Sequence, residues 1–432
     1  GQGAMVGSEI AARAPADGYT LLLASNPNAI SATLYSKLTF NPVEDFGPDI
    51  LYVPNRCILC TRCVRFMEEV AGDAVLNVSE RGDRAFIGIS QEQKLDHPWA
   101  GNVVDLCPVG SLLSKDFLHK ARAWDLDKWA SVCPGCTQGC NINVDTRDDV
   151  VVRIRPRPNL DVNRHFICDY GRSNYRWMNR GDRIEAPLVR EGGRLVATDW
   201  DAALARLGQV LRGASGSAVV LASGRASTES LGLVHRMLAR FTVTAAVQVP
   251  TGEEAPLPGI PGLALRRERA PNLVGAELVG YTPRWDSALR QIPGAAVVVV
   301  LDAELSPADL AALAAASGIV VVLGTVLNAA LRDAELVLPV TSMVEENGTY
   351  VNRDRRIQRF GQAKSPPGMA RPAWWVAGEA QAGEGPAEAP STAAEAFELL
   401  GIHWPVFAGL THDDLGYTGR VLAAASLEGA IR

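Results

Sequence analysis

The sequence predicts an α/β protein in which a cysteine-rich, metal-binding part precedes a parallel sheet with helices on its faces. Three observations carry this prediction. All eight cysteines lie within residues 57–168, and the cysteine-free stretch from about 183 onward alternates short apolar runs with helical patterns. Hydrophobic residues make up 47% and charged residues 21% of the 432 residues. That composition is apolar enough to build buried cores and excludes a disordered chain.

Charge and hydropathy exclude two further classes. The 42 basic and 48 acidic side chains give a net charge of −6, whereas a general nucleic-acid binder carries a basic excess. The longest apolar run, residues 295–301, has the length of a strand and ends at Asp302, so we predict no membrane span. The N-terminal residues 1–5 have neither a basic nor an apolar region of a signal peptide, which indicates an internal start.

The elements are expected in the following order. Residues 1–48 hold a helix-like segment, a strand at 19–23 and turns rich in Asn and Pro. Residues 49–125 carry the first cysteine group and residues 126–182 the second. Within the second, 142–145 and 150–154 alternate as the strands of a hairpin do.

The remaining chain reads as alternating strands and helices. Strands are predicted at 217–223, 295–301 and 319–323. Ser227 is the expected N-cap of a helix with an apolar face formed by Leu231, Val234, Leu238 and Phe241, and Ser306 that of a helix at 307–316. A strand, a ten-residue helix and another strand form a βαβ unit, which implies a parallel sheet within an α/β domain at 183–377.

The C-terminal part is expected to be simpler. Residues 378–395 are rich in Gly, Ala, Pro and Glu, which predicts a linker. Residues 396–432 are expected to form a closing helical segment.

The first cysteine group has ferredoxin-type spacing. Cys57, Cys60 and Cys63 form a CxxCxxC run, and the remote Cys107 is followed by Pro108. A structural zinc site more often uses two separated CxxC pairs, so the spacing favours a [4Fe–4S] cluster. Zinc and a metal-free site remain the alternatives.

The second group repeats this pattern with a slightly wider loop. Its ligands are Cys133, Cys136, Cys140 and Cys168, and its turn residues include Gly135 and Gly139. The same choice between cluster, zinc and no metal applies. If both groups bind clusters, all eight cysteines serve as ligands and none is left for catalysis.

Charged and imidazole side chains near these loops have two interpretations. Arg56, Arg62 and Arg65 either raise the potential of the first cluster or form a solvated basic face. The six histidines form no pair at ligand spacing and are expected to be structural or exposed. No GxGxxG precedes a helix, so we predict no nucleotide site, and the segment 344–348 is expected to be a simple turn.

Five motifs resemble the large iron–sulfur subunit of bacterial NADH-quinone oxidoreductase, the respiratory complex I. They are VPNRCILCTRCVRF (53–66), GNVVDLCPVGSL (101–112), VCPGCTQGCN (132–141), HFICDYGR (165–172) and EENGTYVNRDRRIQ (345–358). The resemblance covers residues 49–432. It implies a ferredoxin-like [4Fe–4S] domain followed by a molybdopterin-oxidoreductase-like domain, with the second cluster in a small subdomain at 126–182.

The resemblance also implies a function. Cys57, Cys60, Cys63 and Cys107 would hold a cluster on the electron path from the flavin toward quinone. The other four cysteines would hold an extra cluster off that path. The expected partners are the flavin-bearing and quinone-proximal iron–sulfur subunits of the peripheral arm, on the cytoplasmic side of the inner membrane. The chain would be part of an oxidoreductase, with no NADH site, quinone site or molybdopterin of its own.

Two departures from that family stand out. A complete large iron–sulfur subunit begins with a plant-ferredoxin-like [2Fe–2S] domain and a motif of one histidine and three cysteines for another cluster, and neither is present in this sequence. We therefore expect an interrupted electron path. Residues 1–48 instead resemble the N-terminal part of Bug-type solute receptors of tripartite tricarboxylate transporters, in the elements DGYTLL and NPVEDF. That resemblance implies an appended fragment joined near residue 48.

Two other functions compete with the electron-transfer subunit. A catalytic molybdopterin enzyme, such as a formate dehydrogenase, needs a Cys, selenocysteine or Ser ligand to its metal, and no Cys follows Cys168. A solute-binding protein would rest on residues 1–48 alone.

Overall fold

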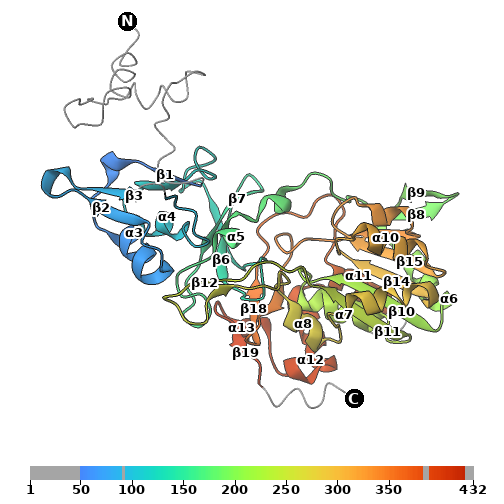
Figure 1. The fold of residues 1–432 in the computed structure, drawn as a ribbon. Helices are drawn as coiled ribbons and strands as arrows, with labels where there is room; N and C mark the ends of the chain where they lie inside the picture. The colour runs from blue at the N-terminus through green and yellow to red at the C-terminus, as the bar shows by residue number, and fades with distance from the viewer. Residues whose placement is uncertain (1–48, 90–92, 383–388, 424–432) are drawn as a thin grey trace, which may run out of the picture. The chain divides into compact units, whose positions relative to one another are not determined.

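The computed structural model describes residues 49–89, 93–382 and 389–423 (Figure 1). The chain divides into two compact units. The first consists of Gly1–His119 with Leu257–Ile260, and the second of Lys120–Pro256 with Pro261–Arg432. The second unit therefore takes in the 126–182 segment and the 183–377 segment except Leu257–Ile260. The helix and strand predicted within residues 1–48 lie outside the described residues.

The first unit is built from short elements around the first cysteine group. Strand β1 (Ile50–Tyr52) pairs antiparallel with β4 (Leu112–Ser114), and β2 (Leu76–Ser79) with β3 (Phe86–Ile89). The helical elements are η1 (Pro54–Arg56), α3 (Arg62–Arg65), the π-helical η2 (Phe66–Ala71), η3 (Gly82–Arg84) and α4 (Asn102–Leu106). Phe66 and Met67 of η2, and Trp99 shortly before α4, are among the buried apolar side chains of this unit.

The second unit begins with a three-stranded antiparallel sheet of β5 (Asp127–Val132), β6 (Asn141–Arg147) and β7 (Val150–Pro156). The predicted hairpin is thus confirmed, with a bulge between Asp145 and Thr146. Its turn residues Asp148 and Asp149 both have positive φ, as a two-residue hairpin turn requires. Helix α5 (Asp169–Ser173) and the 3₁₀ turn η4 (Arg176–Asn179) follow.

The centre of the second unit is a seven-stranded sheet in the order β11-β10-β14-β15-β16-β8-β9. Five strands are parallel, namely β10 (Ser217–Ser223), β11 (Thr242–Gln248), β14 (Val297–Leu301), β15 (Ile319–Gly324) and β16 (Leu336–Pro339). The hairpin of β8 (Leu188–Glu191) and β9 (Arg194–Ala197) extends one edge antiparallel. The α/β class and the parallel sheet are confirmed.

Helices cover both faces of this sheet (Figure 1). Alternate strand residues point to opposite sides, and the apolar residues on each side pack against a separate set of helices. Val297 and Val299 pack with the helices α6 (Trp200–Gly213), α7 (Thr228–Met237), α8 (Leu273–Leu278), α11 (Ala373–Ala382) and α12 (Ala393–His403). Val298 and Val300 pack with α9 (Trp285–Leu289), η5 (Ile292–Gly294), α10 (Pro307–Ala314) and η6 (Ala329–Arg332).

The predicted caps are confirmed. The Ser227 side chain accepts the N–H of Ser230 at the start of α7, and Ser306 forms a capping box with Asp309 at α10. The remaining elements are β12 (Ala255–Pro256), β13 (Ala264–Leu265), β17 (Gly348–Val351), β18 (Arg356–Phe360), η7 (Pro405–Phe407), α13 (His412–Leu415) and β19 (Arg420–Val421).

The segment predicted as a linker, 378–395, is narrower in the structure. Residues up to Ala382 complete α11, and α12 begins at Ala393 after the N-cap Thr392. Ala has the highest helix propensity, and Ala380 and Ala396 are buried against the sheet helices, so composition alone overestimated the linker. None of the helices formed by the described residues is both long and apolar enough to cross a membrane.

Candidate cluster-binding sites

The four cysteines of the first group line one pocket in the first unit. Cys57, Cys60, Cys63 and Cys107 share it with apolar side chains that include Ile87 and Leu112. The pairing of β1 with β4 joins the two cysteine segments. Val53 donates its N–H to the carbonyl of Ser111 at 2.7 Å and accepts the Ser111 hydroxyl at 2.8 Å. This double link brings the remote cysteine to the CxxCxxC run.

Two non-glycine residues of this loop adopt a left-handed backbone conformation, which carries strain. Leu59 and Thr61, on either side of Cys60, both have positive φ (53° and 57°) although neither is glycine. In both cysteine segments a backbone N–H group points at sulfur. Leu59 donates to Sγ of Cys57 at 3.4 Å, and Ser111 donates to Sγ of Cys107 at 3.3 Å. Such donors stabilise negative charge on the sulfur.

Burial affects the ionisation of the Cys63 thiol in this group. It raises the pKa of Cys63 to about 11, and the neighbouring Cys57 and Cys60 add to the rise. A thiol that is protonated at neutral pH binds metal only by losing its proton. Metal binding at the first site would thus convert closely spaced thiols to thiolates, and the bound metal would have to compensate their negative charge.

The second group lies entirely in the second unit, and each of its four cysteines is only 5% exposed. Burial raises the pKa of Cys140 well above its ordinary value, and the proximity of Cys133, Cys136 and Cys168 raises it further. Burial likewise raises the pKa of Cys133 to about 12. The structure thus brings together all four sulfurs predicted for this site, although Cys168 is remote in sequence.

Two glycines allow this close approach. Cys168 is the N-cap of α5, and its Sγ accepts the N–H of Gly171 at 3.4 Å. A Cβ on Gly171 would lie 2.9 Å from Sγ of Cys133. At Gly135 a Cβ would lie 3.3 Å from the ring of Tyr170 and 3.4 Å from the same sulfur. Both positions therefore favour glycine for packing reasons.

Spacing arguments missed two arginines beside Cys136. The backbone N–H of Arg266 and the charges of Arg266 and Arg269 act to lower the pKa of Cys136, against the larger effect of burial. The Arg269 guanidinium also lies 4.7 Å from the ring centre of Tyr170. Both arginines are about 130 positions from the loop, so no local sequence signal could have identified them.

The arginines near the first cysteine loop, and the histidines, lie in other surroundings than Arg266 and Arg269. Arg56, Arg62 and Arg65 are all exposed, in agreement with a solvated basic face. Among the histidines, His165 is exposed, whereas His412 is buried and lies 3.0 Å (Nε2 to Oε1) from Glu229.

The donor sets fit iron–sulfur clusters better than single ions. Within the described parts of the chain, no three His, Cys, Asp or Glu side chains converge closely enough to hold one metal ion. Four thiolates that bind a [4Fe–4S] cluster each contact a different iron and surround the cluster, whereas tetrahedral zinc requires them to meet at one point. Sulfurs that accept backbone N–H groups, as those of the half-buried Cys57 and Cys107 and the buried Cys168 do, suit the former.

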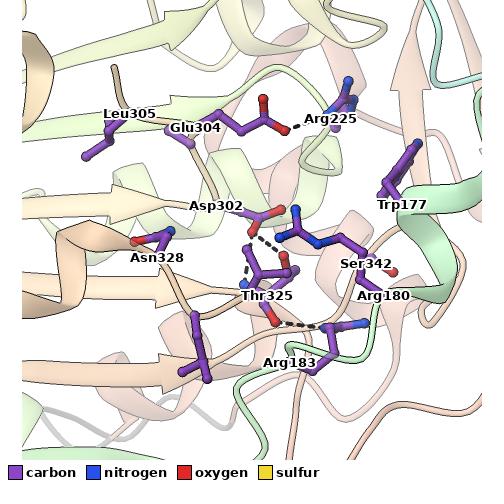
Figure 2. A pocket seen from close by; sticks show the side chains of 13 residues that line it. Trp177, Arg180, Arg183, Arg225, Asp302, Glu304, Leu305, Thr325, Asn328 and Ser342 are labelled. Atoms are coloured by element: carbon purple, nitrogen blue, oxygen red, sulfur yellow. Dashed lines mark hydrogen bonds and ion pairs between the residues drawn. The ribbon is translucent and has the colours of Figure 1, made fainter. Parts of the chain in front are cut away.

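A separate pocket lies at the carboxyl edge of the large sheet, just beyond β10, β14 and β15 (Figure 2). Asp302 follows β14 and accepts the N–H and the hydroxyl of Thr325 at 2.9 and 2.6 Å. Arg183 donates to the Thr325 carbonyl at 2.7 Å, and Arg225 faces Glu304 at 3.6 Å. Figure 2 shows Glu304 and Arg225 turned toward one another, and Asp302 and Arg183 turned toward Thr325.

Three segments of the chain match known protein families. Residues 47–113 match the ferredoxin-like domain of NADH-quinone oxidoreductase subunit 3, and residues 127–180 the Fe4S4 domain of molybdopterin oxidoreductases. Residues 268–380 match molybdopterin oxidoreductase. The first two matches contain the two cysteine groups, one each. The order of a ferredoxin-like domain and then a molybdopterin-oxidoreductase-like domain is therefore confirmed, and the matches support iron–sulfur clusters.

Curated relatives agree with these matches. The chain is 38% identical over 219 residues to NADH-quinone oxidoreductase subunit 3 of Thermus thermophilus. It is 34% identical over 196 residues to a subunit of the NADH-quinone oxidoreductase of Rickettsia bellii. It is 37% identical over 261 residues to the mitochondrial 78 kDa subunit of NADH-ubiquinone oxidoreductase of Neurospora crassa.

The resemblance to the large iron–sulfur subunit is confirmed. The alignments cover 51%, 45% and 57% of this chain but only 28%, 29% and 34% of those relatives. The chain thus spans about a third or less of their length. Acetylene hydratase from Pelobacter acetylenicus superposes with a TM-score of 0.37 at 11% identity, over 63% of this chain and 71% of that one.

Proposed function

We propose that this chain is an iron–sulfur electron-transfer subunit of a respiratory NADH:quinone oxidoreductase. The observation that carries the proposal is the convergence of Cys57, Cys60, Cys63 and Cys107 on one pocket within the segment that matches the subunit 3 ferredoxin-like domain. These cysteines would hold a [4Fe–4S] cluster on the path from the flavin toward quinone. Cys133, Cys136, Cys140 and Cys168 would hold a second.

A bound cluster supplies one-electron redox chemistry, and the chain's own residues determine where and in what environment it operates. The cysteines provide the thiolates. Backbone N–H groups of Leu59, Ser111 and Gly171 point at cysteine sulfurs and stabilise negative charge there. The buried apolar neighbours Ile87 and Leu112 line the first site beside the half-buried cysteines.

The partners and location form part of the same proposal. The chain would work with the flavin-bearing and quinone-proximal iron–sulfur subunits of the peripheral arm. It would contact the membrane only through the complex, on the cytoplasmic side. NADH and quinone would bind to other subunits, so electrons would reach and leave this chain only through its neighbours.

The alternative, a catalytic molybdopterin oxidoreductase, is less supported. The pocket at the carboxyl edge of the sheet has a volume of about 240 Å³, at or below the lower end for small-ligand sites. Several of its charged groups already have partners within the protein: Arg225 faces Glu304, Asp302 accepts the Thr325 hydroxyl, and Arg183 donates to the Thr325 carbonyl. These residues do not fit a large bis-pterin cofactor. The third candidate, a solute-binding protein, depends on residues 1–48, which lie outside the described residues.

The test is to measure iron and acid-labile sulfide per chain on anaerobically purified protein, with EPR spectra after reduction. About eight irons and two cubane signals are expected. Cys107→Ser should abolish only the first signal and Cys168→Ser only the second, with about four irons remaining in each. His165→Ala, which changes an exposed side chain near Cys168, is the matched control and should retain both. Zinc in place of iron would overturn the proposal.

The role in electron transfer needs a separate experiment. NADH alone should leave the clusters oxidised. NADH with the flavin-bearing subunit of the same complex should reduce them, but more slowly than a chemical reductant does, because the electron path upstream of the first cluster is expected to be interrupted. Direct reduction by NADH without that subunit would contradict the proposed absence of a nucleotide site on this chain.

A further inference from the structure

The outer side of the second cysteine loop is held by amide side chains that are distant in sequence. The Nε2 group of Gln358 in β18 donates to the carbonyl of Gly139 at 2.8 Å. Its Oε1 accepts Nδ2 of Asn141 at 2.7 Å. One amide therefore binds the residue before Cys140 and the residue after it. Gln358 is 1% exposed and Asn141 0% exposed, so water does not compete for these bonds.

Asn141 is in turn fixed from the other side. Its Oδ1 accepts Nδ2 of Asn159 at 2.6 Å, and its backbone N–H donates to Oδ1 of Asn163 at 2.9 Å. Both asparagines are buried. The side chain of Asn141 thus has partners at both polar atoms, and neither Asn141 nor Gln358 can rotate without breaking a buried hydrogen bond.

Asn352, directly after β17, makes a further hydrogen bond to the second cysteine loop. Its Nδ2 donates to the carbonyl of Gln138 at 3.1 Å. Gly139 has φ of +67°, and a Cβ there would lie 2.7 Å from Cβ of Asn352. The β17–β18 hairpin therefore lies directly against the cysteine loop and satisfies two consecutive carbonyls, those of Gln138 and Gly139.

We propose that Gln358 is a positioning residue for the second [4Fe–4S] cluster, which fixes Cys140 and raises the reduction potential of the cluster. This inference rests on the proposed cluster-binding role of Cys133, Cys136, Cys140 and Cys168. It assigns a task to the segment 345–358, which the sequence linked to the large iron–sulfur subunit without indicating any role.

The effect on potential follows from peptide chemistry. The carbonyl of Gly139 and the N–H of Cys140 belong to the same peptide unit. A donor on the carbonyl polarises that unit and makes its N–H a stronger donor. This peptide unit belongs to a proposed cluster ligand, so its polarisation acts within one residue of the Cys140 sulfur. Hydrogen bonds to cluster sulfurs stabilise the reduced, more negative state, so loss of the Gln358 bond should lower the potential.

The experiment is an anaerobic redox titration of both clusters by EPR in the full chain. Gln358→Met keeps the length of the side chain and removes the donor and acceptor. Gln358→Glu keeps the acceptor and loses the donor. Gln362→Leu is the matched control, because Gln362 follows closely on the same segment and its Nε2 bonds only to the carbonyl of Lys364.

The expected result is specific to one cluster. At fixed potential, the reduced-to-oxidised ratio of the second cluster should fall about tenfold in Gln358→Met, which corresponds to about 59 mV for one electron. The fall should be at least as large in Gln358→Glu. The first cluster serves as an internal reference and should titrate unchanged, as should both clusters in Gln362→Leu. Selective loss of the second cluster, with the first retained, also supports the inference.

Other outcomes overturn it. An unchanged second potential with full iron content shows that Gln358 has no positioning role, and an equal shift of both clusters shows a general effect on the fold. If Gln358→Met fails to fold, Asn159→Ala provides the decision, because it frees Asn141 from the opposite side and must also lower the second potential. A wild-type chain without a second cluster instead refutes the proposed function, before any variant is compared.

Discussion

Arg183 and Glu345 form a two-point ion pair in the interior of the second unit. The Arg183 side chain is 7% exposed and that of Glu345 is fully buried. Nη1 of Arg183 contacts Oε1, and Nη2 lies 2.7 Å from Oε2. The remaining hydrogen-bonding capacity is also used, since Glu345 accepts the N–H of Ser342 at 2.9 Å. The pair joins the chain before β8 to the turn that leads into β17.

Arg183→Met should destabilise the protein by about 3–5 kcal/mol, because it leaves the Glu345 carboxylate buried without a counter-ion. The measurement is the free energy of unfolding in a denaturant titration. Arg180→Met is the control, since Arg180 pairs with the exposed Asp182 and exposed ion pairs contribute little. Equal losses in the two variants would contradict the importance of burial here.

Gly171→Ala should abolish the second cluster and spare the first. The added Cβ would lie 2.9 Å from Sγ of Cys133 and 3.6 Å from Sγ of Cys168, so at least one ligand must shift. Iron content should fall from about eight to about four per chain, with the first EPR signal unchanged. Gly181→Ala is the control, because a Cβ at Gly181 meets nothing within 4 Å. Full iron content in Gly171→Ala would show that the site tolerates the displacement.

Glu346 should make the stability of the protein fall as the pH rises. Burial raises the pKa of this carboxyl to about 8, and the nearby Glu229 and Glu345 contribute to the rise. Hydrogen bonds, such as the one from the Thr341 hydroxyl at 2.7 Å, oppose it. The folded state therefore retains a proton that the unfolded chain releases near pH ~4.3. The stabilisation is complete below that pH and is lost as the pH rises through about 8.

Glu346→Gln should remove this dependence, because the amide stays neutral at every pH. The free energy of unfolding, measured by denaturant titration between about pH 5 and about pH 9, should fall less steeply in the variant than in the native protein. The two pH profiles should differ by on the order of a few kcal/mol across this range. Glu304→Gln is the control, since Glu304 is exposed. Parallel pH profiles for the native protein and Glu346→Gln would show that Glu346 is ionised in the fold.

The sequence determined the parts of this protein that depend on neighbouring residues. The strand at 217–223 and the caps at Ser227 and Ser306 were predicted correctly, because periodicity and capping are local properties. The cysteine spacing likewise identified two groups that the structure brings together. Composition was a weaker guide, since helices extend into both ends of the predicted linker.

Only the tertiary structure decided which distant groups meet. Gln358 reaches Gly139 across 219 positions, and Arg183 reaches Glu345 across 162. Nothing in the local pattern of either partner specifies the other. Burial then determines how much such contacts contribute to stability. A hydrogen bond or ion pair that contributes little in water leaves an unpaired polar group at a high free-energy cost when it is broken in the interior. The candidate ligands can thus be predicted from spacing, whereas the contacts that hold them in place depend on the packing of remote segments.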